Sequence, residues 1–273
     1  MSKIGIGIIT CNREDFLQTS YMSVAVSSAI QLHDCFVVND GDPLSDETRN
    51  IIGLSDDNLI QHKKNCGVAV SKNNALKRMM DNGCDHLFLM EDDIKLTNIS
   101  TIPKYIEVAE KSGIQHLNYG GHGIYNRTKQ GEIVTRATVK VKDSDISLNL
   151  YYNILGAFSY YSREVIEKVG YMDETFHNAM EHVDHTYQII KAGFHPPYWW
   201  FADLANSWEY IDDIKPFHQE SVIRKNHDEW MENYKIASEY FATKNGHFPT
   251  AVPDPGQAVV GQSLKFLRDK YGN

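Results

Sequence analysis

The first hundred residues alternate short apolar runs with segments in which apolar residues recur at helical spacing. Uninterrupted apolar runs are typical of strands buried on both faces of a sheet. The runs that predict strands are Ile4 to Ile9, Cys35 to Val38, Leu59 to His62 and Leu87 to Met90. The segments that predict helices are Asp15 to Leu32, a short stretch after Pro43, and Ala69 to Met80. This alternation indicates βαβ units and a mainly parallel sheet.

Beyond residue 100 the pattern is less regular. Residues 114–141 contain glycine-rich turns and the alternating β-branched run EIVTRATVKV, which together predict an antiparallel or mixed extension of the sheet. A further strand is predicted from Ile154 to Tyr161. The segments that predict helices are Ser162 to Val169, Glu181 to Ala192, and about His227 to Lys244.

Polar side chains follow three of the predicted strands, in residues 10–13, 39–42 and 91–93. Because the carboxyl ends of parallel strands meet at one edge of a sheet, we expect these segments to face one crevice. Adjacent carboxylates such as those of 91–93 repel one another unless a cation offsets them. Mg²⁺ or Mn²⁺ serves this purpose when it also holds diphosphate oxygens. A metal site is therefore indicated, and the alternative is a solvated turn with capping carboxylates.

Composition narrows the class of protein. The chain has 273 residues, of which 42% are hydrophobic and 23% charged, as expected for a globular protein with a sizeable core. A net charge of -9 and the lack of a Lys/Arg-dense run argue against a nucleic acid or an anionic membrane as partner. No apolar run reaches the roughly 18 residues of a membrane span. The four widely spaced cysteines predict reduced thiols and a cytoplasmic location.

Several motifs occur along the chain in a recognisable order. They are ITCNRE, VVNDGD, NCG followed by SKNNAL, LFLMEDD, GAFSYYSREVIEKVGYMDETF followed by EHVDHTYQIIKAG, and finally HQES and YFATKNG. Each motif alone is weakly specific, but their order resembles that of the inverting family 2 type of GT-A glycosyltransferases. These enzymes move a sugar from a nucleoside diphosphate donor to an acceptor hydroxyl.

The resemblance implies a division of the chain. A GT-A domain is expected over residues 1–205, with a nucleotide-binding half at 1–98 and an acceptor-side half at 99–205. The remaining residues, 206–273, are expected to form a helical segment that packs on the active site. The implied reaction is an inverting, metal-dependent transfer, with a UDP-sugar as donor and a carbohydrate or other hydroxyl-bearing acceptor.

The resemblance also assigns residues to the donor. The expected contacts of nucleoside and phosphate are Thr10, Asn12, Arg13, Asp40, Asn65 and Lys72. Glu91 and Asp93 occupy the two acidic positions of the D-x-D motif, so either Glu91 or Asp92 is expected near the ribose. Asp93 is the expected metal ligand, and His218 matches the late histidine that completes the metal or diphosphate shell. The metal is expected to be Mn²⁺ or Mg²⁺, and imidazole beside carboxylates favours Mn²⁺.

The catalytic base lies in the segment EHVD. An inverting transfer needs a group that takes the proton of the acceptor hydroxyl. At the position where the family has an acid, this chain has His182, so either His182 is the base or Glu181 or Asp184 replaces it. The downstream arginine of the family is also absent, because Gln188 stands there.

Other readings of the same residues stay open. The chain could be an inactive sugar-nucleotide-binding protein of the same fold, or a nucleotidyltransferase. An iron oxygenase with ligands His182, Asp184 and His218 is disfavoured, because that triad belongs to an all-β fold. The aromatic run at 198–201 could stack on sugar rings or pack in the core.

Overall fold

The structure is a computed structural model that describes residues 2–27, 34–216 and 227–273. A six-stranded sheet forms its centre, in the order β3-β2-β1-β4-β9-β6. The strands of this sheet are β1 (Ile4–Thr10), β2 (Asp34–Asn39), β3 (Leu59–Gln61), β4 (His86–Glu91), β6 (His116–Asn118) and β9 (Phe158–Ser162). The helices around it are α1 (Glu14–Ser27), α2 (Asp46–Ile52), α3 (Val68–Asp81), α4 (Thr101–Ser112), α5 (Arg163–Val169) and α6 (Glu181–Lys191).

Strand register places the polar segments together. The strand β1 runs parallel to β2 on one side and to β4 on the other. Thr10 lies opposite Asn39, and Ile9 lies opposite Glu91, so the three strands end at the same edge. The predicted, mainly parallel sheet is confirmed, and the three loops follow strands that end at one edge of it.

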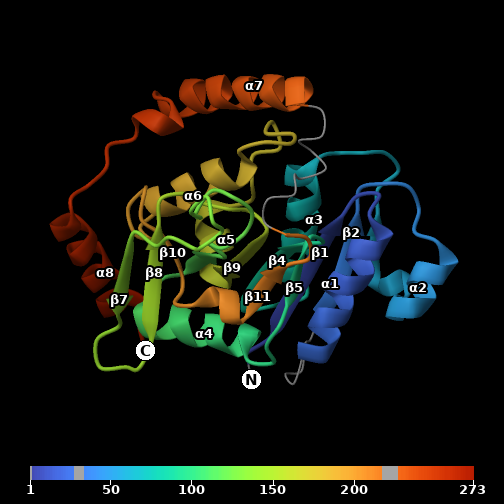
Figure 1. The fold of residues 1–273 in the computed structure, drawn as a ribbon, viewed down its shortest axis with the longest axis horizontal. Helices are drawn as coiled ribbons and strands as arrows, with labels where there is room; N and C mark the ends of the chain where they lie inside the picture. Colours follow the sequence, from blue (N-terminus) through green and yellow to red (C-terminus); the bar gives the residue numbers. More distant parts are fainter. Residues whose placement is uncertain (1, 28–33, 217–226) are drawn as a thin grey trace.

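Helices pack around the sheet (Figure 1), and an apolar cluster lies on each of its faces. On one face, Ile6 and Phe88 belong to a cluster that includes Leu17 of α1 and Tyr105 of α4. On the other face, residues of α3, α5 and α6 share a cluster with Leu89. Because both faces are covered, the strand residues of β1 are buried without alternation.

The second half of the chain departs from the predicted boundaries. The strand β9 starts at Phe158, not at Ile154, and it runs antiparallel to β4, which gives the mixed extension of the sheet. The run EIVTRATVKV contributes β7 (Ala137–Lys140) to a separate sheet, β10-β8-β7, with β8 (Ser147–Tyr151) and β10 (Phe201–Leu204). A two-stranded sheet joins β5 (Ile94–Leu96) to β11 (Ile211–Asp213). This pairing brings residues after 205 next to the acidic loop.

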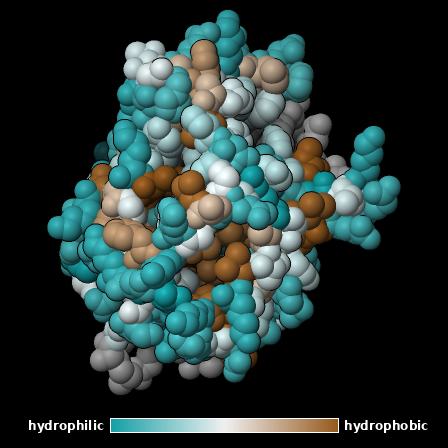
Figure 2. Space-filling view, turned by 90° about the vertical axis from the view of Figure 1, so that its left-hand side faces the viewer, coloured by the Kyte–Doolittle hydropathy of each residue, from teal (hydrophilic) through white to brown (hydrophobic). Residues whose placement is uncertain are grey.

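The C-terminal part contains α7 (His227–Asn245) and α8 (Gln257–Tyr271), and short 3₁₀ turns are η1 (Asp56–Asn58), η2 (Ser207–Glu209) and η4 (Pro249–Ala251). The helix α8 packs on α4, where Asn273 donates a backbone hydrogen bond to Glu110 at 2.9 Å. The helix α4 is not predicted above, and α8 lies in the C-terminal segment that is expected to be helical but is not predicted as a separate helix. Figure 2 looks at the side where α8 lies and shows hydrophobic residues gathered in a mostly hydrophilic face. No helix among the described residues is long and apolar enough to cross a membrane.

Candidate active site

Asp92, the middle acid of the loop after β4, is completely buried. It accepts a hydrogen bond from Thr10 Oγ1 at 2.6 Å and forms an ion pair with Arg13. Burial raises the pKa of Asp92 to about 7, although the charge of Arg13 acts in the opposite direction. Asp92 therefore ties the loop after β1 to the end of β4.

Asp93 has a less complete set of partners. Its Oδ2 lies 3.4 Å from Arg13 Nη1, and its Oδ1 is buried with no hydrogen-bond partner among the described residues. A buried carboxylate oxygen without a donor costs free energy. A cation beside Asp93 would remove that cost.

Lys72 of α3 connects the two halves of the site. Its side chain is 1% exposed, and Nζ lies 2.7 Å from Glu91 Oε1 and 3.1 Å from Glu181 Oε1. Nζ also donates to the carbonyl of Gly156 at 3.1 Å. Burial alone would lower the pKa of Lys72, but the charges of Glu91 and Glu181 outweigh it and raise the pKa. The ammonium group is thus a buried cation held between two carboxylates.

The first turn of α6 carries the three candidates for the base. Glu181 is buried, and His182 Nδ1 lies 3.0 Å from its Oε1. Burial favours the neutral form of Glu181, but Lys72 and His182 outweigh burial and hold the pKa of Glu181 well below its ordinary range. Glu181 is therefore ionised and can only accept a hydrogen bond, so His182 Nδ1–H is the donor. The His182 side chain is 22% exposed, which leaves its second nitrogen for a ligand.

Asp184 faces away from this group of side chains and toward α7. Its Oδ2 accepts a hydrogen bond from Lys244 Nζ at 2.7 Å, and its Oδ1 accepts one from Asn245 at 3.1 Å. Asp184 is buried, and these bonds attach the end of α7 to α6. The motif YFATKNG, which contains Lys244 and Asn245, therefore holds α7 in place.

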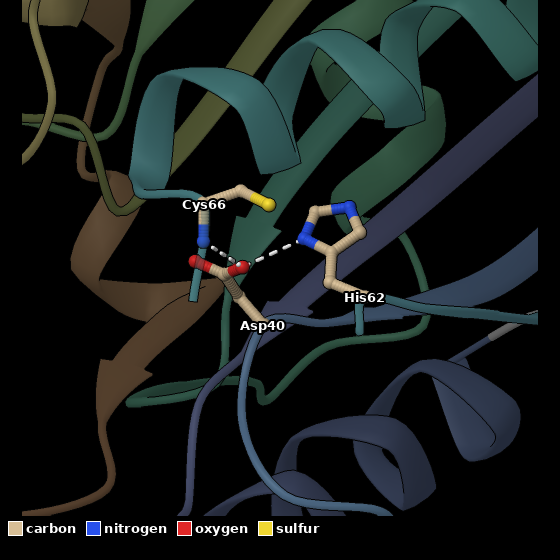
Figure 3. A group of neighbouring side chains, drawn as sticks. All are labelled: Asp40, His62 and Cys66. Atoms are coloured by element: carbon tan, nitrogen blue, oxygen red, sulfur yellow. Dashed lines mark hydrogen bonds and ion pairs between the residues drawn. The ribbon is translucent and has the colours of Figure 1, made fainter. Parts of the chain in front are cut away.

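Asp40 organises the loops at the nucleoside end of the site. Its Oδ1 accepts hydrogen bonds from the backbone of Cys66 at 2.7 Å and from His62 Nδ1 at 2.6 Å, as Figure 3 shows. Its Oδ2 accepts a bond from the backbone of Gly67 at 2.8 Å. Asp40 therefore joins the loops after β2 and β3 to the start of α3.

Two asparagines belong to the same loops. Asn12 adopts a positive φ of 54° and accepts a hydrogen bond from the backbone of Asp42 at 2.7 Å. A Cβ at Gly41 would lie 2.2 Å from Asn12 Oδ1, so only glycine permits this approach. Asn65 donates to the carbonyl of Asp40 at 3.1 Å. The residues expected at the nucleoside thus form one connected rim.

The atoms of Asp40, His62 and Cys66 that could bind a metal lie within 4.8 Å of one another. Sequence reasoning did not include His62 or Cys66. A divalent ion there would have to replace the Asp40–His62 hydrogen bond, which itself accounts for the closeness of two of these groups. The third group, the Cys66 thiol, lies close to Asp40 because the backbone N–H of Cys66 donates a hydrogen bond to the Asp40 carboxylate.

A pair that the sequence did not predict, His122 and Asp213, lies beside the acidic loop. His122 Nδ1 is 2.7 Å from Asp213 Oδ1, and Gly123 donates its backbone N–H to Asp213 Oδ2 at 3.0 Å. Burial favours neutral His122, but the charges of Asp93 and Asp213 outweigh it and raise the pKa of His122 to about 9. The sequence signal was a histidine within the glycine-rich segment 120–123.

Comparison with known proteins gives results for structure only. No family model matches the sequence, and no curated protein matches it. TarS from S. aureus has a TM-score of 0.53 at 17% identity, over 99% of this chain and 44% of that chain. The mannosyltransferase PcManGT from Pyrobaculum calidifontis, in complex with GDP-Man and Mn²⁺, has a TM-score of 0.55 at 12% identity, over 98% and 70% of the two chains.

A third structure, GalNAc-T7 with UDP, GalNAc and Mn²⁺, has a TM-score of 0.55 at 10% identity, over 99% of this chain and 56% of that chain. The chain has the GT-A fold. The fold that the sequence motifs predict is confirmed. The present chain spans less than half of the full TarS structure.

A divalent metal fits the residues around Asp93. The buried and unpartnered Oδ1 is the observation that supports this fit, because carboxylate oxygen is a preferred ligand of Mn²⁺ and Mg²⁺. The second predicted ligand, His218, lies outside the described residues.

The structure gathers most of the other predicted residues at this edge of the sheet. Asp184 is the one whose bonds lead to α7 instead. The aromatic run after α6 packs in the core, where Tyr198 and Trp200 are buried and Trp200 Nε1 donates to Asp254 at 3.1 Å.

Proposed function

We propose that this protein is a metal-dependent glycosyltransferase. It transfers one sugar from a nucleoside diphosphate sugar, with UDP as the nucleoside diphosphate, to an acceptor hydroxyl with inversion. Solved structures with the same fold hold UDP-GlcNAc in TarS and GDP-Man with Mn²⁺ in PcManGT, which supports a nucleotide-sugar donor.

One observation carries the proposal most directly. The carboxylate of Asp93 stands at the carboxyl edge of β4 with a buried oxygen that has no partner among the described residues, beside the ion pairs Arg13–Asp92 and Lys72–Glu91. Ligands of open α/β sheets bind at this edge. The metal held by Asp93 would neutralise the negative charge that develops on the leaving diphosphate.

His182 is the proposed base. Because its Nδ1–H is donated to ionised Glu181, the neutral ring has its lone pair on Nε2, which can take the proton of the acceptor hydroxyl. The carboxylate of Glu181 then stabilises the imidazolium that forms, as the aspartate does in a serine protease triad. Lys72 keeps Glu181 ionised and so fixes the tautomer of His182.

The nucleoside is proposed to bind at the rim formed by Thr10, Asn12, Asp40 and Asn65. In the present structure the two oxygens of Asp40 accept backbone bonds from the start of α3. Asp40 therefore shapes the rim, and it influences binding of the nucleobase indirectly, by holding the loops that form the rim.

A donor screen tests the proposal. UDP-sugars and GDP-mannose are incubated with the protein, Mn²⁺ and a panel of acceptors, and released nucleotide is measured. Asp93→Asn is expected to abolish metal-dependent release, whereas the exposed Asp57→Asn control is expected to retain it. His182→Gln is expected to lower kcat by about 10² to 10⁴ without changing the affinity for UDP.

Three outcomes are decisive. Normal turnover by Asp93→Asn would show that the metal assignment is wrong. Tight UDP binding without release from any donor would favour the alternative of an inactive binding protein. Release of pyrophosphate from a nucleoside triphosphate and a sugar phosphate would favour a nucleotidyltransferase.

A further inference from the structure

The His122–Asp213 pair is built into the wall of the site beside Asp93. The strand β11 pairs antiparallel with β5, with Asp213 opposite Ile94. The backbone N–H of Ile214 donates to the carbonyl of Asp93 at 2.8 Å. Asp213 thus lies directly alongside the acidic loop, although the two are far apart in the sequence.

The loop that carries His122 is fixed at both ends. Gly120 donates its N–H to Asp203 at 2.9 Å, and Gly123 donates its N–H to Asp213 at 3.0 Å. A Cβ at Gly121 would lie 2.7 Å from the hydroxyl of Tyr119, so the loop passes this ring only without a side chain. The His122 ring is consequently held in one place by packing and by its bond to Asp213.

The environment of the ring is strongly acidic. The charges of Asp93, Asp213 and Glu91 all act on His122, and its side chain is 26% exposed. With Nδ1 engaged by Asp213, the nitrogen left for a ligand is Nε2, and a metal that binds there would release the proton of Nε2 to solvent. An imidazole that gives one N–H to a carboxylate and keeps the other nitrogen for a cation is the usual arrangement of a metal-binding histidine.

The following inference rests on the proposed function. We infer that His122 Nε2 is a ligand of the divalent metal that Asp93 holds, and that Asp213 is its positioning residue. Neither residue was assigned by sequence motifs. A mixed set of imidazole and carboxylate ligands predicts a preference for Mn²⁺ over Mg²⁺, because imidazole nitrogen is a poor ligand for Mg²⁺.

Direct Mn²⁺ binding tests this inference without any need for turnover. Free Mn²⁺ is measured by electron paramagnetic resonance in titrations of the full chain, with Mn²⁺ alone and with Mn²⁺ plus UDP. His122→Gln and Asp213→Asn are each expected to weaken Mn²⁺ binding by about 10- to 100-fold. The control is His86→Gln, because His86 lies at the opposite end of β4, where it bonds to Tyr160. It is expected to bind Mn²⁺ as the wild type does.

A measurement on unchanged protein covers the case in which a variant fails to fold. Pulsed electron paramagnetic resonance of the Mn²⁺ complex is expected to detect a directly bonded ¹⁴N nucleus in the wild type and in His218→Gln. The coupling is expected to disappear when His122→Gln is combined with His218→Gln, which removes the other expected imidazole ligand. No ¹⁴N coupling in His218→Gln alone, or its persistence in the folded double variant, would overturn the inference.

Two further results separate this inference from its alternatives. UDP affinity in the presence of EDTA is expected to be the same for all variants. If His122→Gln instead loses UDP affinity in EDTA and keeps its Mn²⁺ affinity, the ring binds diphosphate and the inference is wrong. Mn²⁺ binding that depends on His122, without release from any sugar nucleotide, would support the inference and refute the proposed transferase.

Discussion

Replacing Lys72 by methionine is expected to destabilise the protein by about 3–5 kcal/mol near neutral pH. The 1% exposed lysine side chain places its ammonium group 2.7 Å from Glu91 and 3.1 Å from Glu181, so its removal leaves the buried carboxylate of Glu181 and the partly buried carboxylate of Glu91 facing each other. Removing one partner of a buried ion pair is costly because the remaining charge has neither water nor a counterion. Methionine retains most of the volume, so the lost charge dominates the change.

The loss is also expected to depend on pH. In the wild type Lys72 holds the pKa of Glu181 below its ordinary value, so this contribution is present above about pH 4.3 and is lost on acidification. In Lys72→Met the two carboxylates raise the pKa of each other, so the folded variant binds a proton and loses stability as pH rises. The deficit of the variant should therefore be larger at about pH 8 than at about pH 5.

Urea denaturation at these two pH values measures the effect. The control is Lys77→Met on the same helix, since Lys77 is 46% exposed and lies 3.5 Å from Glu174. This surface pair should contribute less than about 1 kcal/mol. The double variant with Glu181→Gln should recover about half of the loss or more, because it removes one of the two unpaired charges. A loss equal to that of Lys77→Met, or one independent of pH, would refute this account of Lys72.

Three further predictions concern the pH dependence of stability, the attachment of α7, and the removal of metal. Burial lowers the pKa of His185 and of His195 to about 4, so the unfolded chain binds more protons below about pH 6.5 and the protein should lose about 2 kcal/mol per histidine between pH 8 and pH 5. In urea melts, His185→Gln should lose about 2 kcal/mol less than the wild type over this interval, and an unchanged loss would contradict the assignment. Asp184→Asn should break the bond to Lys244 and increase hydrogen exchange in α7 while UDP affinity stays unchanged; a large fall in kcat with α7 intact would instead identify Asp184 as the base. Removal of metal by EDTA should abolish sugar transfer and lower the melting temperature relative to protein with Mn²⁺, because a metal at Asp93 stabilises only the folded state; a melting temperature that is the same with Mn²⁺ and with EDTA would contradict the metal site.

The parallel half of the fold could be predicted because its signals are local. The strands β1, β2 and β4 are covered on both faces, so they appear in the sequence as continuous apolar runs. The helix α4 also carries a local signal, with Ile102, Tyr105 and Val108 at helical spacing. Pro103 obscures it, although proline is tolerated in the first turn of a helix.

The helix α8 shows the opposite case. Only Val260 and Leu267 of this helix are buried, and most of its remaining residues face solvent. A periodic apolar stripe is therefore hardly visible in the sequence. Its position is fixed by the contact with α4, which a local pattern does not contain.

The candidate site divides in the same way. The acids at the end of β4 could be found because they follow an apolar run and because the parallel strands end together. The roles of the individual acids could not, since they depend on distant partners: Asp92 on Thr10 and Arg13, and Glu91 on Lys72. Adjacent carboxylates in the sequence thus have separate electrostatic environments in the fold.

These separate environments explain why a bound metal is not required next to each of the three acids of the loop. Arg13 offsets Asp92, and Lys72 lies between Glu91 and Glu181, so the protein itself supplies a cation beside each of these acids. Asp93 retains an unpartnered oxygen, and β11 places the His122–Asp213 pair next to it. If Arg13 and Lys72 were removed, several carboxylates would compete for the metal. Their presence directs a divalent ion to Asp93. The Lys72 experiment therefore tests how the protein neutralises the neighbouring acids, and the His122 experiment tests which groups bind the metal.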